Sequence, residues 1–457
     1  MLKYLKKIKK EGKMKKEIQL SDHFSYRRLI KFVIPSVVMM IFTSIYGVVD
    51  GIFVSNFVGK TPFAAINLVY PLMMILGGFG FMLGTGGTAI VAKTFGIGDK
   101  DKANEYFTFI IISTVVMGSI LAAVGIAFAR PVAMLLGAEG EMLQYAVSYV
   151  QIVLLALPFF MLQNSFQNFF VTAEKPKLGL AVTVMAGVTN IVIDALFVAV
   201  FDWGLEGAAI ATALSQTVGG LVPVIYFASK NSSTLRFRRT KAHWKVLMFA
   251  SFNGFSELLS NVSASIVTIC YNVQLLAHAG EDGVAAYGVI MYVSFIFVSI
   301  FIGFVIGASP IVSFHFGAGN SDELSSLRKK STAIVFISGL AMLIISLLLS
   351  TPLCKMFVGY DEGLYLLTRR GFIINAFSFL LAGFNIFGSS YFTALNNGVV
   401  SALISFMRTL VFQIGAVFIL PLLFGLDGIW FSLIVAEALT SVVIEVFLLA
   451  NKKRYRY

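Results

Sequence analysis

One stretch of this sequence occurs twice and decides how the chain is organised. Residues 86–98 read GGTAIVAKTFGIG and residues 307–319 read GASPIVSFHFGAG, with three glycines, a valine and a phenylalanine at matching positions. The two stretches are 221 residues apart. The same spacing aligns Pro131 with Pro352, Thr172-Ala173 with Thr393-Ala394, and Gly204-Leu205-Glu206-Gly207 with Gly425-Leu426-Asp427-Gly428. Because one offset serves four separate regions, we infer that the second half of the chain repeats the first.

The composition predicts a membrane protein. Of the 457 residues, 58% are hydrophobic and 13% are charged, whereas a soluble domain has roughly 45–50% apolar and about 25% charged residues. The apolar residues form twelve runs, each longer than the roughly 18 residues that indicate a membrane span. These runs cover residues 29–55, 63–92, 106–129, 143–170, 177–201, 206–228, 246–275, 284–314, 331–351, 364–391, 399–420 and 426–449. Their length and lack of alternating polarity favour helices over the strands of a membrane barrel.

Each half of the repeat contains six of these runs, so both halves enter the membrane from the same side. We therefore predict an all-α polytopic membrane protein with twelve transmembrane helices in two six-helix bundles, related by a pseudo-two-fold axis along the membrane normal. The predicted parts are a basic N-terminal tail (1–28), an N-lobe (29–229), a linker (230–245), a C-lobe (246–449) and a basic C-terminal tail (450–457). Two lobes that face each other across a cavity are what alternating access requires.

Basic residues are concentrated on one side of the predicted membrane. The net charge of +12 alone would be compatible with nucleic-acid binding. However, 29 of the 35 Lys and Arg residues lie on the side of the tails, in the tails, in the loops or, for Lys31 and Lys177, in the first residues of a run, whereas the opposite loops carry only Lys60, Arg130 and Lys355. Cytoplasmic loops show this excess of basic residues. We therefore expect cytoplasmic termini, contact with a lipid bilayer and no nucleic-acid partner.

Acidic residues inside the predicted helices are the first candidates for function, because a charge at the bilayer centre costs at least ~2.5–3.5 kcal/mol. Asp50 lies in the first helix, fifteen residues after Pro35. Proline lacks the backbone donor and crowds the preceding turn, so the helix can bend at Pro35. The alternative is that Asp50 lies near the outer end of the helix and simply reaches water.

Two pairs of polar residues lie in the fourth and fifth helices of the N-lobe. Asn190 and Asp194 are one turn apart on one face of the fifth helix. An amide beside a carboxylate offers a Na⁺ ligand, or a donor that holds the carboxylate in place. Asn164 and Gln167 are three residues apart in the fourth helix and would complete a polar patch. For both pairs, the alternative is a set of hydrogen bonds that links helices.

The C-lobe has three deep charges. Glu257 lies in the seventh helix and is the acidic residue expected to face the cavity from this lobe, although a purely structural role is an equal alternative. Arg408 and Glu437 lie in the middle of the eleventh and twelfth helices. Because they belong to one lobe, we predict that they form a structural ion pair. The position that corresponds to Asp194 is Gly415, so ion coupling is expected to be concentrated in the N-lobe.

Motifs for enzymatic chemistry are weak or missing. Gly59-Lys60-Thr61 ends like a phosphate-binding loop, but Val54 stands where its first glycine is required. Cys270 is expected in a helix and Cys354 in a loop, and neither suggests a disulfide or a metal site. The histidines have no metal-ligand spacing, and no nucleophile elbow or pair of catalytic carboxylates is present. We therefore expect a protein that is not an enzyme and has no cofactor.

Taken together, these residues resemble the multidrug and toxic compound extrusion (MATE) family of transporters, over nearly the whole chain. The features that carry the resemblance are the six-plus-six repeat, the first-helix stretch Pro35…Val49-Asp50-Gly51, the fifth-helix stretch Asn190-Ile191-Val192-Ile193-Asp194 and the loop Thr172-Ala173-Glu174-Lys175-Pro176. The Met-rich and basic character is most similar to the bacterial MepA-like branch.

The resemblance implies a secondary active multidrug efflux transporter of a bacterial plasma membrane. It implies export of cationic or amphipathic small molecules in antiport with H⁺ or Na⁺, and a monomer. It further implies an ion-coupling site formed by Asp50, Asn164, Asn190 and Asp194. From the positions of the polar residues we also expect a substrate cavity lined by Asp50, Gln167, Asp194 and Glu257. Other branches of the family often have an additional acid in the tenth helix, whereas this chain has Asn375 and Asn385 there.

Two alternatives remain open at this point. A flippase of the same superfamily would move lipid-linked oligosaccharides, but it would need a basic cavity for a pyrophosphate head group. The deep charges of this chain are mostly acidic, which favours cationic substrates. A membrane sensor or binding protein without transport is the second alternative.

Overall fold

The computed structural model describes residues 18–53, 57–455 and 457, and for residues 48–53 and 60 it describes the backbone alone. No described residue lies in a β-strand. The first half contains α2 (Tyr26–Phe53), α3 (Lys60–Ile97), α4 (Lys100–Ala127), α5 (Ala129–Leu135), α6 (Gly140–Leu155), α7 (Leu157–Thr172), α8 (Pro176–Asp194), the π-helix η2 (Ala195–Val200) and α9 (Gly204–Ala228). The second half contains α10 (Trp244–Gly317), α11 (Ser321–Val358), α12 (Glu362–Ala376), α13 (Phe379–Ala394), α14 (Gly398–Phe406), the π-helix η3 (Met407–Gln413), α15 (Ile414–Ile419), α16 (Pro421–Phe424) and α17 (Leu426–Tyr455).

The helices agree with the predicted number of membrane spans. Within the described ranges, nine helices are long and apolar enough to cross a membrane, and counting each bent pair as one span raises the number to eleven. The two pairs are α6 with α7, bent by 57°, and α12 with α13, bent by 49°. Helix α10 has 74 residues and a non-helical Gly280 with φ of 62°, and both Gly254 in its first part and Gly317 at its end pack against α3. It therefore turns back at Gly280 and supplies two spans, which makes twelve.

Two boundaries differ from the predictions. Cys354 was expected in a loop, but it is buried inside α11, because this helix continues past Pro352 to Val358. The segment from 450 onward was expected to be a tail, but α17 extends to Tyr455. In both places the apolar run ends before the helix does, because a helix can leave the membrane without unwinding.

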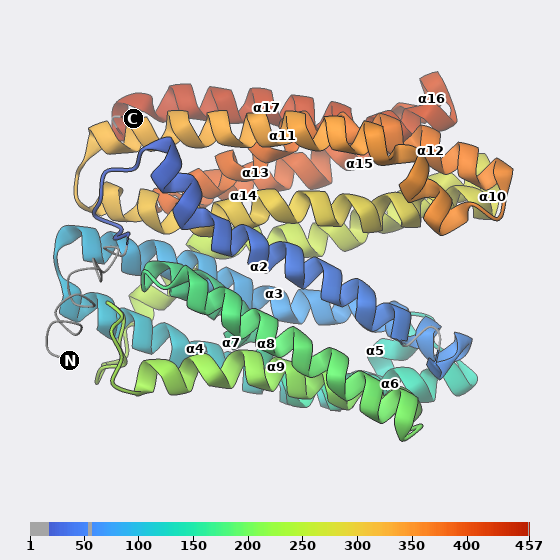
Figure 1. The fold of residues 1–457 in the computed structure, drawn as a ribbon, viewed down its shortest axis with the longest axis horizontal. Coiled ribbons are helices and arrows are strands. Elements are labelled where there is room, and N and C mark those ends of the chain that lie inside the picture. The colour runs from blue at the N-terminus through green and yellow to red at the C-terminus, as the bar shows by residue number, and fades with distance from the viewer. Residues whose placement is uncertain (1–17, 54–56, 456) are drawn as a thin grey trace, which may run out of the picture.

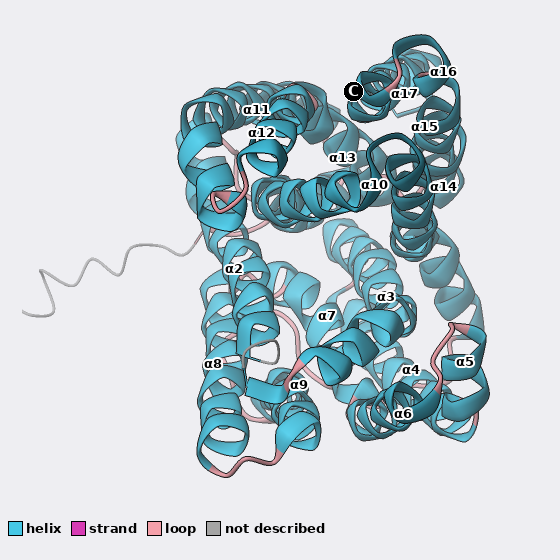
Figure 2. Ribbon diagram, turned by 90° about the vertical axis from the view of Figure 1, so that its right-hand side faces the viewer, coloured by secondary structure: helices cyan, strands magenta, loops and turns pink. Residues whose placement is uncertain are grey.

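The helices form two bundles that lie side by side, the N-lobe (α2–α9) and the C-lobe (α10–α17) (Figure 1). Viewed along the long axis, the two bundles are stacked and α2 lies at the boundary between them (Figure 2). We call the end of the molecule where α2 begins and α17 ends the terminal end, and the other the opposite end.

Glycines of the repeated stretch bring the two lobes together near the terminal end. A Cβ at Gly86 would lie 2.0 Å from the carbonyl oxygen of Ala250, and a Cβ at Gly317 would lie 2.0 Å from that of Lys93. Gly96 meets Phe314 in the same way. Only glycine allows two helix backbones to approach so closely. The repeated stretch of sequence therefore also forms the close contact between the two lobes.

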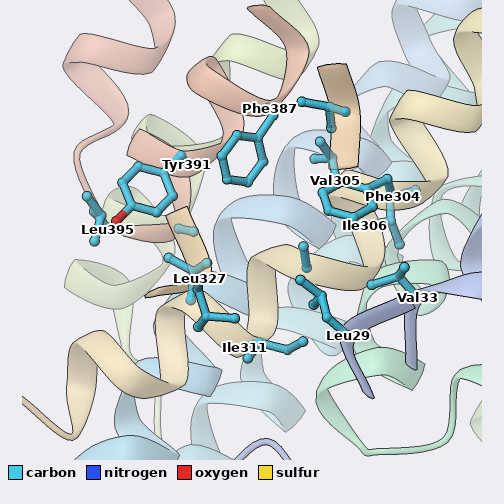
Figure 3. Packing of buried hydrophobic residues seen from close by; sticks show 14 of the residues in the cluster. Leu29, Val33, Phe304, Val305, Ile306, Ile311, Leu327, Phe387, Tyr391 and Leu395 are labelled. Atoms are coloured by element: carbon cyan, nitrogen blue, oxygen red, sulfur yellow. The ribbon is translucent and has the colours of Figure 1, made fainter. Parts of the chain in front are cut away.

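A hydrophobic cluster at the same end includes residues of both lobes (Figure 3). Leu29 and Val33 of α2 lie beside Phe304 and Ile311 of α10, and all four are buried. The first helix of the N-lobe is thus packed on the C-lobe over its first turns. Its later turns pack on α8 of its own lobe, as Gly187 of α8 shows through its contact with Phe42.

Candidate ion and substrate site

The candidate site of the N-lobe lies between α2 and α8. A Cβ at Gly187 of α8 would lie 2.5 Å from the ring of Phe42 and 3.1 Å from the ring of Tyr46, both on α2. Asn190 and Asp194 follow Gly187 by three and seven residues, so they are on the same face of α8. Asn190 is 2% exposed and Asp194 is 0% exposed. The helix packing therefore places a buried amide and a buried carboxylate on the side of α8 that faces α2.

Asp50 is in the last turn of α2, but its side chain lies outside the described residues. Helices α2 and α8 both begin at the terminal end, where the backbone N–H of Leu20 donates to Glu174 just before α8. The two helices therefore run in the same direction. Asp50 follows Tyr46 by one turn, as Asn190 follows Gly187 by one turn. The backbone register is compatible with a site shared by Asp50 and Asp194, and that site stays a prediction.

The helix changes its geometry directly after Asp194. The next six residues, Ala195–Val200, form a π-helix, and the N–H of Phe201 donates to the carbonyl of Leu196 at 2.9 Å. Short π-helical segments inside α-helices are rare and occur frequently at functional sites. Asp194 is therefore next to a backbone irregularity as well as being a buried acid in a membrane helix.

The polar pair of α7 points to two different neighbours. Asn164 is 3% exposed and donates to the carbonyl of Gly77 on α3 at 3.3 Å. Gln167 is 4% exposed and lines a small cavity with Gln163, Thr183 and Gly219. This cavity lies between α7, α8 and α9. The described contact of Asn164 thus links it to α3, while Gln167 faces the interior of the N-lobe.

Glu257 lies at the boundary between the lobes. It is on α10, three residues after Gly254, whose Cβ position is 2.0 Å from the carbonyl oxygen of Met82 on α3. One turn further on, Asn261 donates to the carbonyl of Glu257 at 2.8 Å and lies beside Gly78. Glu257 is half-buried. It therefore flanks the contact between α10 and α3, and its place in a substrate cavity stays a prediction.

Arg408 and Glu437 form an ion pair inside the C-lobe. The Arg408 Nη2 lies 2.5 Å and the Nε 3.1 Å from Oε1 of Glu437. The other carboxylate oxygen accepts from Asn385 Nδ2 at 2.5 Å, and Ser441 donates to Asn385 Oδ1 at 3.0 Å. Glu437 is 2% exposed. Both oxygens of this buried acid thus have donors, which is the condition for a charge to be tolerated away from water.

The hydrogen bond between Asn385 and Glu437 is not among the contacts that the sequence predicts. The repeat contained a signal for it, because Asn385 corresponds to Asn164 at the 221-residue offset and Glu437 corresponds to Gln216. Both lobes thus have an amide at the same place in their fourth helix. The offset aligns Arg408 with Gly187, so the N-lobe has no such ion pair at the corresponding positions.

Comparison with known proteins gives a consistent result. The family model described as MatE matches residues 35–196 and 255–419, one stretch in each lobe. The chain is 26% identical over 418 residues to the "Multidrug export protein MepA" of Staphylococcus haemolyticus, covering 91% of each chain. It is 24% identical over 433 residues to the protein of the same name from Staphylococcus aureus, covering 93% of this chain and 94% of that one.

Solved structures share the fold. One is described as the outward-facing conformation of a multidrug resistance MATE family transporter of the MOP superfamily, with a TM-score of 0.91 and 21% identity over 96% of this chain and 99% of that one. Another is described as a crystal structure of MATE in the straight conformation, with a TM-score of 0.89 and 22% identity over 96% and 98% of the two chains. The similarity extends over both lobes and confirms the predicted two-lobe helical architecture.

Proposed function

This chain belongs to the MatE family, and from that premise we propose that it is a secondary active multidrug transporter that exports organic cations in exchange for H⁺ or Na⁺. The observation that carries the proposal is Asp194, a fully buried carboxylate on a membrane helix. Placing a charge at the centre of a membrane helix costs at least ~2.5–3.5 kcal/mol on scales from membrane-insertion experiments. An acid that is kept at such a cost is expected to bind a cation at some stage of the cycle.

The coupling site of the proposal comprises Asp50, Asn164, Asn190 and Asp194, with Gln167 and Glu257 as further residues of the substrate cavity. A bound drug cation is held by the negative charge and by contacts with aromatic rings. An incoming H⁺ or Na⁺ neutralises the carboxylates and weakens the hold on the drug. Helix α2 repacks at Pro35 as the drug leaves. Competition of this kind couples two ligands through one site.

The positions of the contacts between the lobes support an outward-facing state. The close glycine contacts between α3 and α10 are near the terminal end. The concentration of Lys and Arg residues at that end is the reason to assign it to the cytoplasm. In this orientation both termini are cytoplasmic, and the lobes are closed towards the cytoplasm. The staphylococcal relatives support a bacterial plasma-membrane location.

The relatives named multidrug export proteins support small drug molecules as substrates, and the acidic residues of the candidate site are the reason to propose cationic or amphipathic ones. The charge distribution of the C-lobe supports the same choice over a lipid-linked pyrophosphate. Arg408 is paired with Glu437 of its own lobe, so it adds no net positive charge to the interior. We extend the proposal to a monomer that requires no cofactor beyond the coupling ion.

The proposal is tested by dye transport in proteoliposomes whose pH and Na⁺ gradients are varied independently. Uptake of a cationic dye against its gradient is expected with one of the two ions, and Asp50→Asn should abolish it. Glu206→Gln is a matched control, because Glu206 is an exposed acid in the first turn of α9. Full dye transport by Asp50→Asn, or dye transport that depends on neither the pH gradient nor the Na⁺ gradient, would contradict the proposed antiport.

A further inference from the structure

Two segments of the chain cross between the lobes at the terminal end, and neither belongs to the candidate ion site. The first is the N-terminal strap, residues 18–25, which precedes α2 of the N-lobe. The second is the linker strap, residues 235–243, which precedes α10 of the C-lobe. Each strap therefore leads into the first helix of one lobe. Each also contacts the other lobe, as the following contacts show.

The N-terminal strap is fastened to α11 of the C-lobe. The buried carboxylate of Glu323 accepts from the backbone N–H of Phe24 at 2.9 Å, and its other oxygen lies 2.6 Å from Nδ1 of His23. The ammonium of Lys330, two turns further along α11, donates to the carbonyl of Phe24 at 2.5 Å. The ring of Phe24 is fully buried, and its centroid is 6.5 Å from that of His315 on α10. Three polar contacts and one buried ring therefore join this strap to the C-lobe.

The same strap also contacts the N-lobe. The backbone N–H of Leu20 donates to Oε1 of Glu174 at 2.7 Å, in the turn between α7 and α8. Glu174 has a φ of 60°, a left-handed conformation that non-glycine residues rarely adopt. Leu20 is 2% exposed. The strap is thus fixed to Glu174 on one lobe and to Glu323 and Lys330 on the other, so separation of the lobes at this end has to break one set of contacts.

The linker strap makes the reciprocal contact with α4 of the N-lobe. The backbone N–H of Arg236 donates to Asn104 at 2.6 Å, and that of Arg238 donates to Thr108 at 3.0 Å. The guanidinium of Arg238 pairs with Asp101. At the end of the strap, Nε2 of His243 lies 3.4 Å from the carboxylate of Glu105. The next residue, Trp244, begins α10 of the C-lobe.

The two straps therefore make similar contacts with corresponding helices. Helices α4 and α11 correspond in the repeat, since their N-cap residues Asp99 and Asn320 are 221 residues apart. Each strap has a histidine beside a glutamate in the first two turns of the corresponding helix of the opposite lobe. The glutamates themselves do not correspond, because Lys102 stands at the position of Glu323. Similar contacts built from different residues indicate that the crossing itself matters.

We propose that the two straps hold the terminal end closed in the transport cycle, and that Glu323 and Glu105 are the positioning residues that seat them. The inference rests on the proposed alternation of the two lobes. The contacts of the two straps differ in strength. Glu323 is buried and makes two contacts, whereas Glu105 is about one third exposed and makes one longer contact. Hydrogen bonds to a buried charge contribute more than exposed ones, so the N-terminal strap should dominate.

The test measures the separation of the lobes directly in the full chain. Spin labels at the exposed positions 100 and 329 report on the terminal end, and labels at the exposed positions 139 and 362 report on the opposite end. The background replaces Cys270 and Cys354 with serine and alanine. Glu323→Gln should raise the ratio of open to closed terminal ends about tenfold, Glu105→Gln should raise it less, and the double variant should raise it most. The opposite end should close in parallel.

The matched control is Asp322→Asn, because Asp322 is the exposed acid next to Glu323 and should leave both distances unchanged. If Glu323→Gln does not fold, Lys330→Gln removes a different contact of the same strap and should open the terminal end in the same direction. Distances in the double variant and in Lys330→Gln that equal those of Asp322→Asn would overturn the inference. The measurement needs neither drug nor ion gradient, so its outcome is separate from that of the dye-transport test.

Discussion

The two lobes have the same order of helices but different chemistry in their interiors. In the N-lobe the buried acid is Asp194 on α8, beside Asn190 and directly before a π-helix. In the C-lobe the acid in the middle of a membrane helix is Glu437 on α17, held by Arg408 and Asn385. A duplicated fold thus has one acid on the helix that faces α2 and one acid in a complete ion pair. The proposed transport role therefore falls on the first acid, and the second is part of a structural ion pair.

The corresponding positions make the contrast sharper. Gly415 stands where the N-lobe has Asp194, and a Cβ added to Gly415 would meet nothing within 4 Å. Gly187 stands where the C-lobe has Arg408, and there a Cβ would overlap the ring of Phe42. The two glycine positions thus differ in their surroundings, since a side chain would have open space at Gly415 and would overlap a ring at Gly187. The lobes have become specialised, although their backbones still follow one repeat.

The largest expected effect follows from replacing the acid of the N-lobe. Asp194→Asn keeps the shape of the side chain and removes its charge, so ion-driven dye transport should be abolished while the melting temperature in detergent changes little. Both are measured on the same purified protein, with transport assayed in proteoliposomes. Near-normal transport by Asp194→Asn would remove the distinction between the two lobes.

Replacing the acid of the C-lobe should instead affect stability. Glu437→Gln leaves the Arg408 guanidinium without its carboxylate, and breaking a buried pair in this way costs about 3 kcal/mol or more. A thermal or denaturant unfolding series in detergent measures this loss. The double variant Arg408→Gln/Glu437→Gln should recover most of it, since no charge is then left uncompensated. A double variant as unstable as the single one would show that the pair is not the cause.

A smaller effect is expected from replacing glycines that occupy corresponding positions in the two lobes. Gly96→Ala and Gly317→Ala each place a Cβ 2.0 Å from a carbonyl oxygen of the other lobe. Each should disfavour the closed terminal end by about 1–3 kcal/mol, the usual cost of overpacking. Labels at positions 100 and 329 measure the shift. Gly288→Ala is the control, because its Cβ would meet nothing within 4 Å. Unequal effects of the two variants would show that the repeat glycines are not equivalent.

The smallest effect concerns the caps of the two corresponding helices. Asp99 accepts from the N–H of Lys102 and Asn320 accepts from the N–H of Glu323, both at 3.1 Å. Asp99→Ala should cost about 1 kcal/mol of unfolding free energy, the typical value for an N-cap. Asn320→Ala should cost more, because it also loosens the turn that holds Glu323 against the N-terminal strap. Equal losses in melting experiments would argue against that extra role.

Much of the fold could be predicted from the sequence. The twelve apolar runs predicted the membrane spans, because long apolar segments are stable only in lipid or packed against one another. The 221-residue offset predicted two similar lobes. The break within α10 could not be predicted in this way. Residues 276–283 separate two apolar runs, yet they are helical apart from Gly280, because a turn between antiparallel helices needs only one residue with positive φ.

The site could be predicted only in part. Asn190 and Asp194 stood out as polar residues in an apolar run, because a charge in the bilayer is costly wherever the helix is placed. The neighbours of these residues could not be predicted, because the sequence around Gly187 does not show that this face of α8 packs against Phe42 and Tyr46 of α2. Asn385 corresponds to Asn164 in the repeat, but its hydrogen bond to Glu437 could not be predicted, because the two residues lie on different helices.

By itself the sequence determined the class of protein, the number of spans, the duplication and the identity of the deep acids, because hydropathy and charge act along the chain. Only the tertiary structure decided that Glu437 pairs with Arg408 and that Asp194 lies on the side of α8 that faces α2. It also decided that residues 18–25 and 235–243 cross to opposite lobes. The physical reason is that hydrogen bonds and close backbone contacts depend on distances between residues that are far apart in sequence, as His23 and Glu323 are.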